Sequence, residues 1–410
     1  MRGNCRFNGN FFFISCWRYG KDTLLLLKRN RGMKIVYVYD AIARPGGVER
    51  IMVDKMNYLA EIYKYEVYFI SSDQGAHPFS FPLSPQITHI DLNIQQYLQY
   101  QYQYPKRLLV RWRLNKLFRR NLKEQLKKID PDIICCNTYY KADTICQLKC
   151  RALKVIESHC AKAYTNQNDG IKRSTIIQWF HNYQLSRYNR IIEKRCDALV
   201  TLTQDDAMQW KKEKNVFIIP NMIKYISDLH NACTEHRVIS AGRLVHQKGY
   251  DRLINAWVHV HKKHPDWKLD IFGGGILYDD LSKLITKYQL ENTIRICSPT
   301  SKIMNEFSHS SIYAMSSNFE GFPMVLLEAM SCGLPCISFD CPYGPNTIIS
   351  SHKDGIIVEN NNIKQLSEAI CFLIENDTIR QQYGIEARKS IMRYLPETIM
   401  PQWKQLFENL

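Results

Sequence analysis

The order of strand, glycine-containing loop and helix opens both halves of this chain. Residues 33–39 form an uninterrupted apolar strand, and the loop ARPGGVER separates them from a helix expected over residues 48–63. In the second half, a strand at residues 238–241 precedes the loop GRLVHQKG and a helix expected over residues 250–261. Strands and helices continue to alternate after each unit, which is typical of parallel sheets covered by helices. The sequence therefore predicts an α/β fold with two parallel-sheet domains side by side.

The length of the chain also indicates more than one core. At 410 residues it exceeds an ordinary domain, and two domains of about 150–200 residues are the default. We expect domains at residues 33–223 and 224–390, with the polar, aperiodic residues 222–236 linking them, and residues 391–410 as a helix that packs back on the first domain. Residues 1–32 precede the opening strand, and we interpret them as a dispensable extension.

Composition narrows the class of protein. With 45% apolar and 23% charged residues, the chain is typical of a globular protein of enzyme size. Its cysteines lie in apolar runs and form no CxxC pair, which predicts reduced core residues in a cytoplasmic protein. No run of 18 apolar residues occurs, so we expect no membrane span. The formal net charge of +16 favours an anionic partner: nucleic acid, a membrane surface or an anionic substrate.

The segment SSNFEGFPMVLLEAMSCGLPCISFDCPYGPN, residues 316–346, carries the most chemical information. It places Glu320 and Glu328 on either side of a Gly-Phe-Pro turn that leads into an apolar helix. A helix start offers free backbone N–H groups and the positive end of a dipole, which suit an anion. Carboxylates next to such a start suit a ligand with both hydroxyls and phosphate, such as a sugar nucleotide. The alternative is one helix-capping acid and one acid on a helix face.

Two cations follow the first strand of the second half. Arg243 and Lys248 lie in the loop after residues 238–241, where α/β folds bind ligands at the carboxyl edge of the sheet. An arginine fork and a lysine point charge suit a diphosphate. The alternative is that both are solvated surface cations.

Glycines and one histidine complete the candidate set. Gly46 and Gly47 follow the opening strand, and glycine lets backbone N–H groups approach a phosphate closely; a plain tight turn is the alternative. Gly274 lies in a GGG turn that makes room for a nucleobase or is only a turn. His159 ends a strand in the sequence ESHC and is either a site residue or a structural histidine. Asp130-Pro131-Asp132 is read as a helix end rather than a metal site, so no metal ligand is predicted.

The motifs GGVER, SAGRLVHQKGYDRLINAW, IFGGG and SSNFEGFPMVLLEAMSCGLPCISFD resemble, in order and spacing, the family-4 retaining glycosyltransferases. The resemblance covers residue 33 to the end of the chain and looks closest to bacterial enzymes of capsular, exopolysaccharide and lipopolysaccharide biosynthesis. It implies GT-B architecture, in which two Rossmann-like parallel-sheet domains face a deep interdomain cleft. The first domain would then be the acceptor side, and the second would bind the nucleotide-sugar.

The resemblance also implies a role for each candidate residue. Arg243 and Lys248 would hold the donor diphosphate, Glu328 the ribose, and Glu320 the donor sugar near the reaction centre. His159 would lie near the primary hydroxyl of that sugar. Further donor contacts would come from Gly46, Gly47, Gly274 and the backbone at Phe322, Met324 and Val325. One departure is Pro323, where many relatives have glycine, because proline removes a backbone donor.

The function implied is retaining transfer of a sugar from a nucleotide-sugar, expected to be a UDP-sugar, to a glycan or lipid-linked saccharide acceptor, without cofactor or metal. Residues 105–128 hold ten cationic side chains against one acid, beside leucines and a tryptophan. We expect peripheral contact with an anionic membrane there, or else a solvated basic helix packed on its domain. Alternatives to the transferase are a sugar-nucleotide epimerase or phosphorylase of the same fold, a basic nucleic-acid-binding protein, and an inactive donor-binding subunit. The resemblance favours no nucleic-acid partner.

Overall fold

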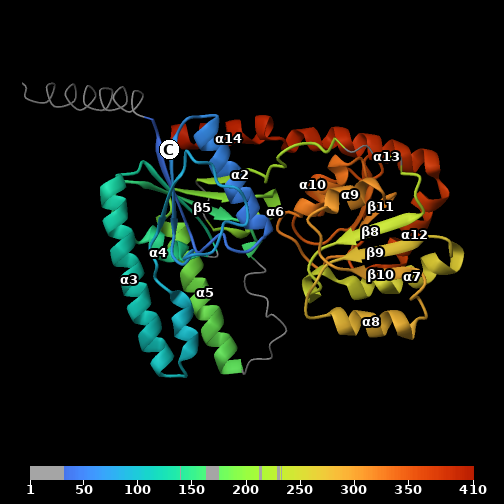
Figure 1. Cartoon of the computed structure of the whole chain (residues 1–410), viewed down its shortest axis with the longest axis horizontal. Coiled ribbons are helices and arrows are strands. Elements are labelled where there is room, and N and C mark those ends of the chain that lie inside the picture. Colours follow the sequence, from blue (N-terminus) through green and yellow to red (C-terminus); the bar gives the residue numbers. More distant parts are fainter. Residues whose placement is uncertain (1–31, 139, 163–174, 212–214, 229–230, 232) are drawn as a thin grey trace, which may run out of the picture. The chain divides into compact units, whose positions relative to one another are not determined.

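The computed structural model describes residues 32–138, 140–162, 175–211, 215–228, 231 and 233–410. The predicted extension, except for residue 32, lies outside these described residues. Contacts divide the chain into two compact units, one of residues up to 136 with 148–153, the other of residues 137–147 with 154–410. Strands and helices alternate in both halves of the chain, around two parallel sheets (Figure 1). The predicted α/β class is confirmed.

The first sheet has seven strands in the order β3-β2-β1-β4-β5-β6-β7. Its strands are β1 (Lys34–Tyr39), β2 (Glu66–Ser71), β3 (Thr88–Asp91), β4 (Ile133–Asn137), β5 (Leu153–Ser158), β6 (Ala198–Thr201) and β7 (Val216–Ile218). The helices between them are α2 (Gly47–Glu61), α3 (Lys106–Ile129), α4 (Ala142–Cys146), α5 (Thr175–Arg195) and α6 (Gln204–Gln209), with a 3₁₀ turn η1 (Gln96–Gln101).

Strand β1 is central because its apolar run is buried on both faces. Ile35, Val36 and Val38 are fully covered, and β1 pairs in parallel with β2 on one side and β4 on the other. Helix α2 returns the chain from β1 to β2, and it buries Met52 and Met56, one turn apart. The change of direction between β2 and β4 makes this a doubly wound sheet.

Residues 72–104 are rich in glutamine and tyrosine, which favours a loop or a mobile helix, but the structure has strand β3 within them. Residues 88–91 pair in parallel with β2, and η1 follows them. Four half-exposed residues, THID, carry too little apolar pattern to predict a strand. Their pairing with β2 makes the strand, and that is a tertiary contact.

The second sheet has six strands in the order β10-β9-β8-β11-β12-β13, and all its pairings are parallel. Its strands are β8 (Arg237–Ala241), β9 (Lys268–Phe272), β10 (Ile294–Cys297), β11 (Ile312–Met315), β12 (Cys336–Phe339) and β13 (Gly355–Val358). The helices that follow β8 along the chain are α7 (Tyr250–Lys263), α8 (Tyr278–Lys287), α9 (Ile303–Ser308), α10 (Met324–Ser331), α11 (Pro345–Ile348), α12 (Ile363–Glu375), α13 (Asp377–Ser390) and α14 (Pro396–Asn409), with 3₁₀ turns η3 (His246–Lys248) and η4 (Ile391–Tyr394).

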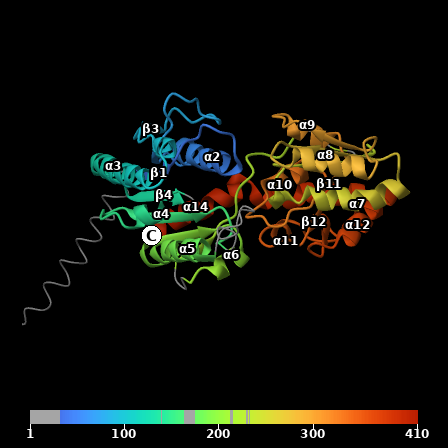
Figure 2. The same cartoon turned by 90° about the horizontal axis from the view of Figure 1, so that it is seen from below.

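Helices surround this sheet in both views (Figures 1 and 2). Helix α7 packs against α8 and α12, and α12 in turn contacts β11, β12 and β13. Helix α10 contacts β12 together with α9 and α13. The amphipathic face of α7 buries Leu253, Trp257 and Val260, which lie on one side of a helix. The helix expected over residues 391–410 is the 3₁₀ turn η4 followed by α14.

Candidate functional site

Two loops meet at the carboxyl edge of the six-stranded sheet. One follows β8 and spans residues 242–249; the other follows β11 and spans residues 316–323. Strands β8 and β11 are parallel neighbours, so their loops leave the sheet at the same edge. The Asn318 N–H donates to the Gln247 carbonyl at 2.8 Å, and the Ser316 hydroxyl donates to the Lys248 carbonyl at 3.0 Å. We call these two segments the loop pair.

Lys248 and Glu320 form an ion pair within the loop pair. The Lys248 Nζ lies 2.7 Å from the Glu320 Oε1, and the two side chains are only 16% and 7% exposed. The Ser317 hydroxyl donates to the same carboxylate oxygen. A largely buried pair with added hydrogen bonds holds both groups in one geometry, and removing one partner leaves an uncompensated charge. The structure thus brings together two residues predicted for the site.

Arg243 is the exposed cation of the loop pair. Its Nη2 lies 3.4 Å from the Gln247 Oε1, a long and weak hydrogen bond. The Gln247 amide is itself anchored, since its Nε2 donates to the Phe319 carbonyl at 3.2 Å. The guanidinium therefore lies at the surface of the loop pair, with most of its donors open to water or to a ligand.

Two glycines allow the close approach of backbone segments at this edge. Gly249 has φ +58°, and a Cβ there would lie 2.4 Å from the Ser316 carbonyl oxygen. A Cβ at Gly273 would lie 1.9 Å from the Gly242 carbonyl oxygen. Gly274, the predicted residue, is less constrained, because a Cβ there would meet the Pro299 ring at 3.4 Å. Its carbonyl accepts from the Leu244 N–H at 3.0 Å, so it supports the loop pair through its backbone.

Helix α10 begins at Met324, as predicted, with Pro323 in the N-cap position. The first backbone N–H groups of any helix have no partner within it, so the amides of Met324 and Val325 are donors at the helix start. Phe322 is buried and its ring packs edge-on against Tyr394. Glu328 lies half-buried in the second turn of α10. The turn before α10 is thus packed in place by Phe322.

His159 follows β5 and is held by a residue that the sequence reading missed. Its Nε2 lies 2.9 Å from the Glu157 Oε2, and the two side chains are only 4% and 5% exposed. Residues two apart on a strand point to the same face, so the period of ESHC was the signal for Glu157. With Nε2 donating to a carboxylate, the Nδ1 of a neutral ring is an acceptor. That Nδ1 is buried and has no hydrogen-bond partner in the described part of the chain.

Gly46 and Gly47 open helix α2 in the first unit. Gly46 is its N-cap, with extended backbone. A Cβ at Gly46 would collide with the Glu49 carboxylate, which accepts a hydrogen bond from the Tyr39 hydroxyl at 2.7 Å. A Cβ at Gly47 would meet no atom within 4 Å, so this backbone is uncovered.

The basic segment forms helix α3, as predicted. Phe118, Leu122, Leu126 and Ile129 are buried along one face of it. In the part of the chain that the structure describes, no helix is both long and apolar enough to cross a membrane. The twelve cysteines among the described residues form no disulfide, and most of them are buried.

With this geometry in place, two family models match the chain. Residues 224–390 match "Glycosyl transferases group 1", and residues 45–224 match "Glycosyltransferase Family 4". Together they cover residues 45–390, which include the six-stranded sheet and every strand of the seven-stranded sheet except β1. These matches and the two-sheet fold identify a glycosyltransferase of GT-B architecture. The chain belongs to the family-4 glycosyltransferases.

Individual proteins agree with this assignment. An uncharacterized glycosyltransferase of Haemophilus influenzae is 29% identical over 90% of this chain and 99% of its own length. The amylovoran biosynthesis glycosyltransferase AmsD of Erwinia amylovora is 34% identical over 51% of this chain and 62% of its own. A TarM variant of Staphylococcus aureus, solved with UDP, shares the fold at TM-score 0.69 and 16% identity, covering 92% of this chain and 99% of that one. The epimerase, phosphorylase and nucleic-acid-binding alternatives gain no support from these matches.

Proposed function

We propose that this glycosyltransferase moves a sugar from a UDP-sugar to a glycan or lipid-linked saccharide in the biosynthesis of a surface polysaccharide, with retention of configuration. The observation that carries the proposal is the Lys248–Glu320 pair at the carboxyl edge of the six-stranded sheet. It presents a fixed ammonium and a fixed carboxylate in one place, which suits a ligand with both phosphate and hydroxyls. The relatives support the substrate class: AmsD is named for amylovoran biosynthesis, and the TarM variant was solved with UDP.

In the mechanism we propose, the loop pair stabilises the leaving nucleotide. The acceptor oxygen attacks the anomeric carbon as the bond to the β-phosphate oxygen breaks, and the acceptor proton passes to that phosphate oxygen. Negative charge develops on the departing phosphate, where Lys248, Arg243 and the start of α10 would stabilise it. Because Glu320 already orients the Lys248 ammonium, little reorganisation is needed when the charge develops.

We assign the remaining donor contacts to residues of both halves. Glu328 would accept from the ribose hydroxyls, Glu320 would lie against the sugar, and the amides of Met324 and Val325 would serve the phosphate or sugar. The free Nδ1 of His159 would accept from a hydroxyl of the donor sugar. Gly46 and Gly47 would approach the diphosphate, and Gly274 and the Phe322 backbone would shape the donor site.

We place the acceptor at an anionic membrane surface that the protein contacts through residues 105–128. Lipid-linked saccharides are presented at such a surface. Each cationic side chain near the surface contributes about 1 kcal/mol to the free energy of membrane binding. The protein would then be a cytoplasmic enzyme in peripheral contact with the inner face of the membrane.

Donor screening tests the proposal. Purified protein is heated with a panel of UDP-, GDP-, ADP- and CMP-sugars, and the donor raises the melting temperature because it binds only the folded state. The transferred sugar is then followed in a coupled assay with EDTA present, and the anomeric configuration of the product is read by NMR. Absence of stabilisation by any nucleotide-sugar would overturn the donor assignment. A product of inverted configuration would overturn retention.

A further inference from the structure

Helix α3 consists of two halves that differ in burial. In the second half, Phe118, Leu122 and Leu126 recur every four residues and are buried. In the first half, residues 106–113, no side chain is buried. Leu109 and Trp112 are 60% and 62% exposed, and Leu108 is 48% exposed. The alternative of a basic helix packed on its domain therefore holds for the second half only, and Trp112 takes no part in that packing.

The exposed apolar side chains of the first half form one stripe bordered by cations. At about 100° per residue, Leu108, Trp112 and Leu109 occupy an arc of about 100°. Arg107 and Arg111 border one side of this arc, and Lys106 and Arg113 border the other. An apolar stripe between two rows of cations is the pattern of a helix that lies in a membrane interface. We call residues 104–113 the α3 tip.

Among the described residues, the cations of the α3 tip have no acidic partner. The first turn of α3 has no acidic residue. In the described ranges, none of Lys106, Arg107, Arg111 and Arg113 has a carboxylate within ion-pair distance. Two of them rest on aromatic faces: the Arg107 Cζ lies 4.5 Å from the centroid of Tyr100, and the Lys106 Nζ lies 4.5 Å from that of Tyr102. These contacts hold the charges in place without neutralising them.

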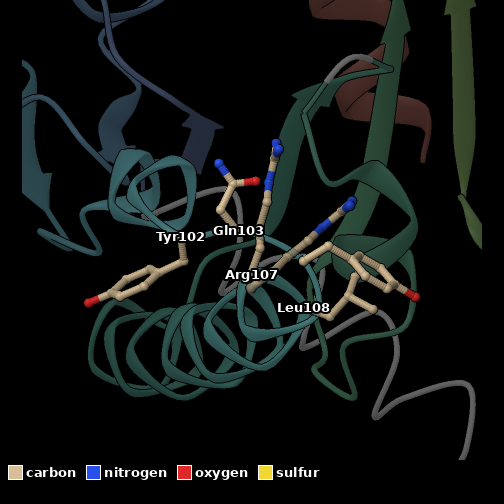
Figure 3. A pocket seen from close by; sticks show the side chains of 6 residues that line it. Tyr102, Gln103, Arg107 and Leu108 are labelled. Carbon is tan, nitrogen blue, oxygen red and sulfur yellow. The ribbon is translucent and has the colours of Figure 1, made fainter.

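A hollow of about 330 Å³ lies at the α3 tip. Figure 3 shows its side chains, with Gln103 and Arg107 next to one another and Tyr102 and Leu108 to either side. The residues that line it are Tyr102, Gln103, Tyr104, Arg107, Leu108 and Arg111. Two guanidinium groups, an amide and two phenols are hydrogen-bond donors that suit a phosphate group.

We propose that the α3 tip docks on an anionic phospholipid bilayer, with a lipid phosphate bound in the hollow between Arg107 and Arg111. Leu108, Leu109 and Trp112 then enter the interfacial layer beside it, which removes their apolar surface from water. A soluble phosphate would use the arginines but would leave this apolar stripe in water, so the stripe favours the bilayer. The inference rests on the membrane contact in the proposed function and assigns it to the first half of α3.

Vesicle sedimentation tests the charge requirement. The full chain is mixed with vesicles of phosphatidylglycerol and phosphatidylcholine, or of phosphatidylcholine alone. The Arg107→Gln/Arg111→Gln variant is expected to lower the partition coefficient on anionic vesicles at least tenfold, since each cation near the surface is worth about fivefold. The matched control is Lys123→Gln/Lys127→Gln, which loses the same charge from the packed half of the same helix. An equal loss in both variants would show a net-charge effect and overturn the proposal.

Two further experiments test whether docking requires the apolar stripe and whether the bound phosphate belongs to a lipid. Leu109→Ser/Trp112→Ser is expected to weaken binding to anionic vesicles about tenfold, whereas Ile385→Ser, at an apolar residue of α13 that is 51% exposed, leaves it unchanged. Inorganic phosphate or diphosphate at 5 mM (with ionic strength held constant) is expected not to displace the protein. Displacement at that concentration would mean a soluble-anion site and overturn the bilayer assignment. Tighter binding to single-stranded DNA than to the vesicles would do the same.

Transfer to a water-soluble acceptor separates this inference from the proposed function. All variants of the α3 tip are expected to keep that activity. If the protein shows no transfer but sediments with vesicles through the α3 tip, the proposed function fails and the inference stands. If transfer is intact and wild-type protein does not bind anionic vesicles, the inference fails together with the proposed membrane contact, while the proposed sugar transfer stands.

Discussion

The two sheets use charge in opposite ways. At the six-stranded sheet, Lys248 is paired with Glu320, and the fully buried Asp270 accepts hydrogen bonds from Arg237 and Arg295. On the connection between β3 and β4 of the seven-stranded sheet, the α3 tip leaves its cations exposed. The same α/β build therefore carries a pre-formed polar site in one half and a charged surface in the other. A small ligand needs fixed groups, whereas a surface partner needs accessible ones.

The largest effect should follow from removing the paired cation. Lys248→Ala is expected to lower kcat about 10²–10³-fold, because a fixed charge at the leaving group is lost. Lys248→Arg keeps the charge and should retain more activity. Lys262→Ala, an exposed cation on α7, is the matched control and should behave as wild type. Steady-state transfer rates of the variants measure this effect. A kcat of Lys248→Ala equal to that of wild type would contradict the proposed mechanism.

The buried carboxylate of Asp270 should make the second half sensitive to acid. Burial alone would raise the pKa of Asp270, but hydrogen bonds and charge from Arg295 and Arg237 outweigh it and hold that pKa below its usual value. A lowered folded-state pKa adds stability that is present above the unfolded value of about 3.9 and lost as pH falls through the folded value.

Asp270→Asn is therefore expected to lower the free energy of unfolding by about 3 kcal/mol at pH 7, since it removes the carboxylate that Arg237 and Arg295 share and leaves Arg237 with Glu306 alone. The difference from wild type should shrink below about pH 4. Urea denaturation at pH 7 and at a pH below about 4 measures this difference in the free energy of unfolding. Glu368→Gln, from an exposed pair with Lys364, should change the free energy of unfolding by less than about 0.5 kcal/mol. A difference that is the same at both pH values would contradict the assigned pKa.

Gly249→Ala should loosen the loop pair. The residue has φ +58°, and the new Cβ would press on the Ser316 carbonyl, so a loss of about 2 kcal/mol in the free energy of unfolding is expected. Gly47→Ala is the matched glycine: its Cβ meets no atom, and alanine favours the helix it opens. Thermal unfolding measures the stability of both variants. Equal stability of the two would show that the loop pair accommodates the added Cβ at residue 249 without cost.

The smallest effect concerns the histidine. Glu157→Gln is expected to lower kcat about tenfold with little change in KM for the donor, because the amide no longer fixes which nitrogen of His159 carries the hydrogen. Glu157→Asp should recover part of the rate. Glu193→Gln removes another largely buried carboxylate, which pairs with Lys162. This variant should change the free energy of unfolding without changing kcat. An unchanged kcat in Glu157→Gln would leave Glu157 a structural residue.

Local patterns predicted the parts of the site that lie next to strands. The α10 start at Met324 follows from the apolar run after a Gly-Phe-Pro turn, and Arg243 and Lys248 follow a strand, so the edge they occupy was predictable. Glu157 was missed although its spacing to His159 was visible. Strand β3 was missed because its four residues carry no strong pattern and depend on β2.

The sequence by itself determined the alternation of strands and helices, the motifs of the family and the position of Arg243, Lys248 and His159 after strands. Periodicity and glycine placement are local, so the chain states them directly. Only the tertiary structure decided that Lys248 pairs with Glu320, 72 residues away, and that Gly273 rather than Gly274 lies tightly against the Gly242 backbone. It also decided which half of α3 is covered. These outcomes depend on which strands are neighbours and on what packs over each helix, and both are set by contacts between distant segments.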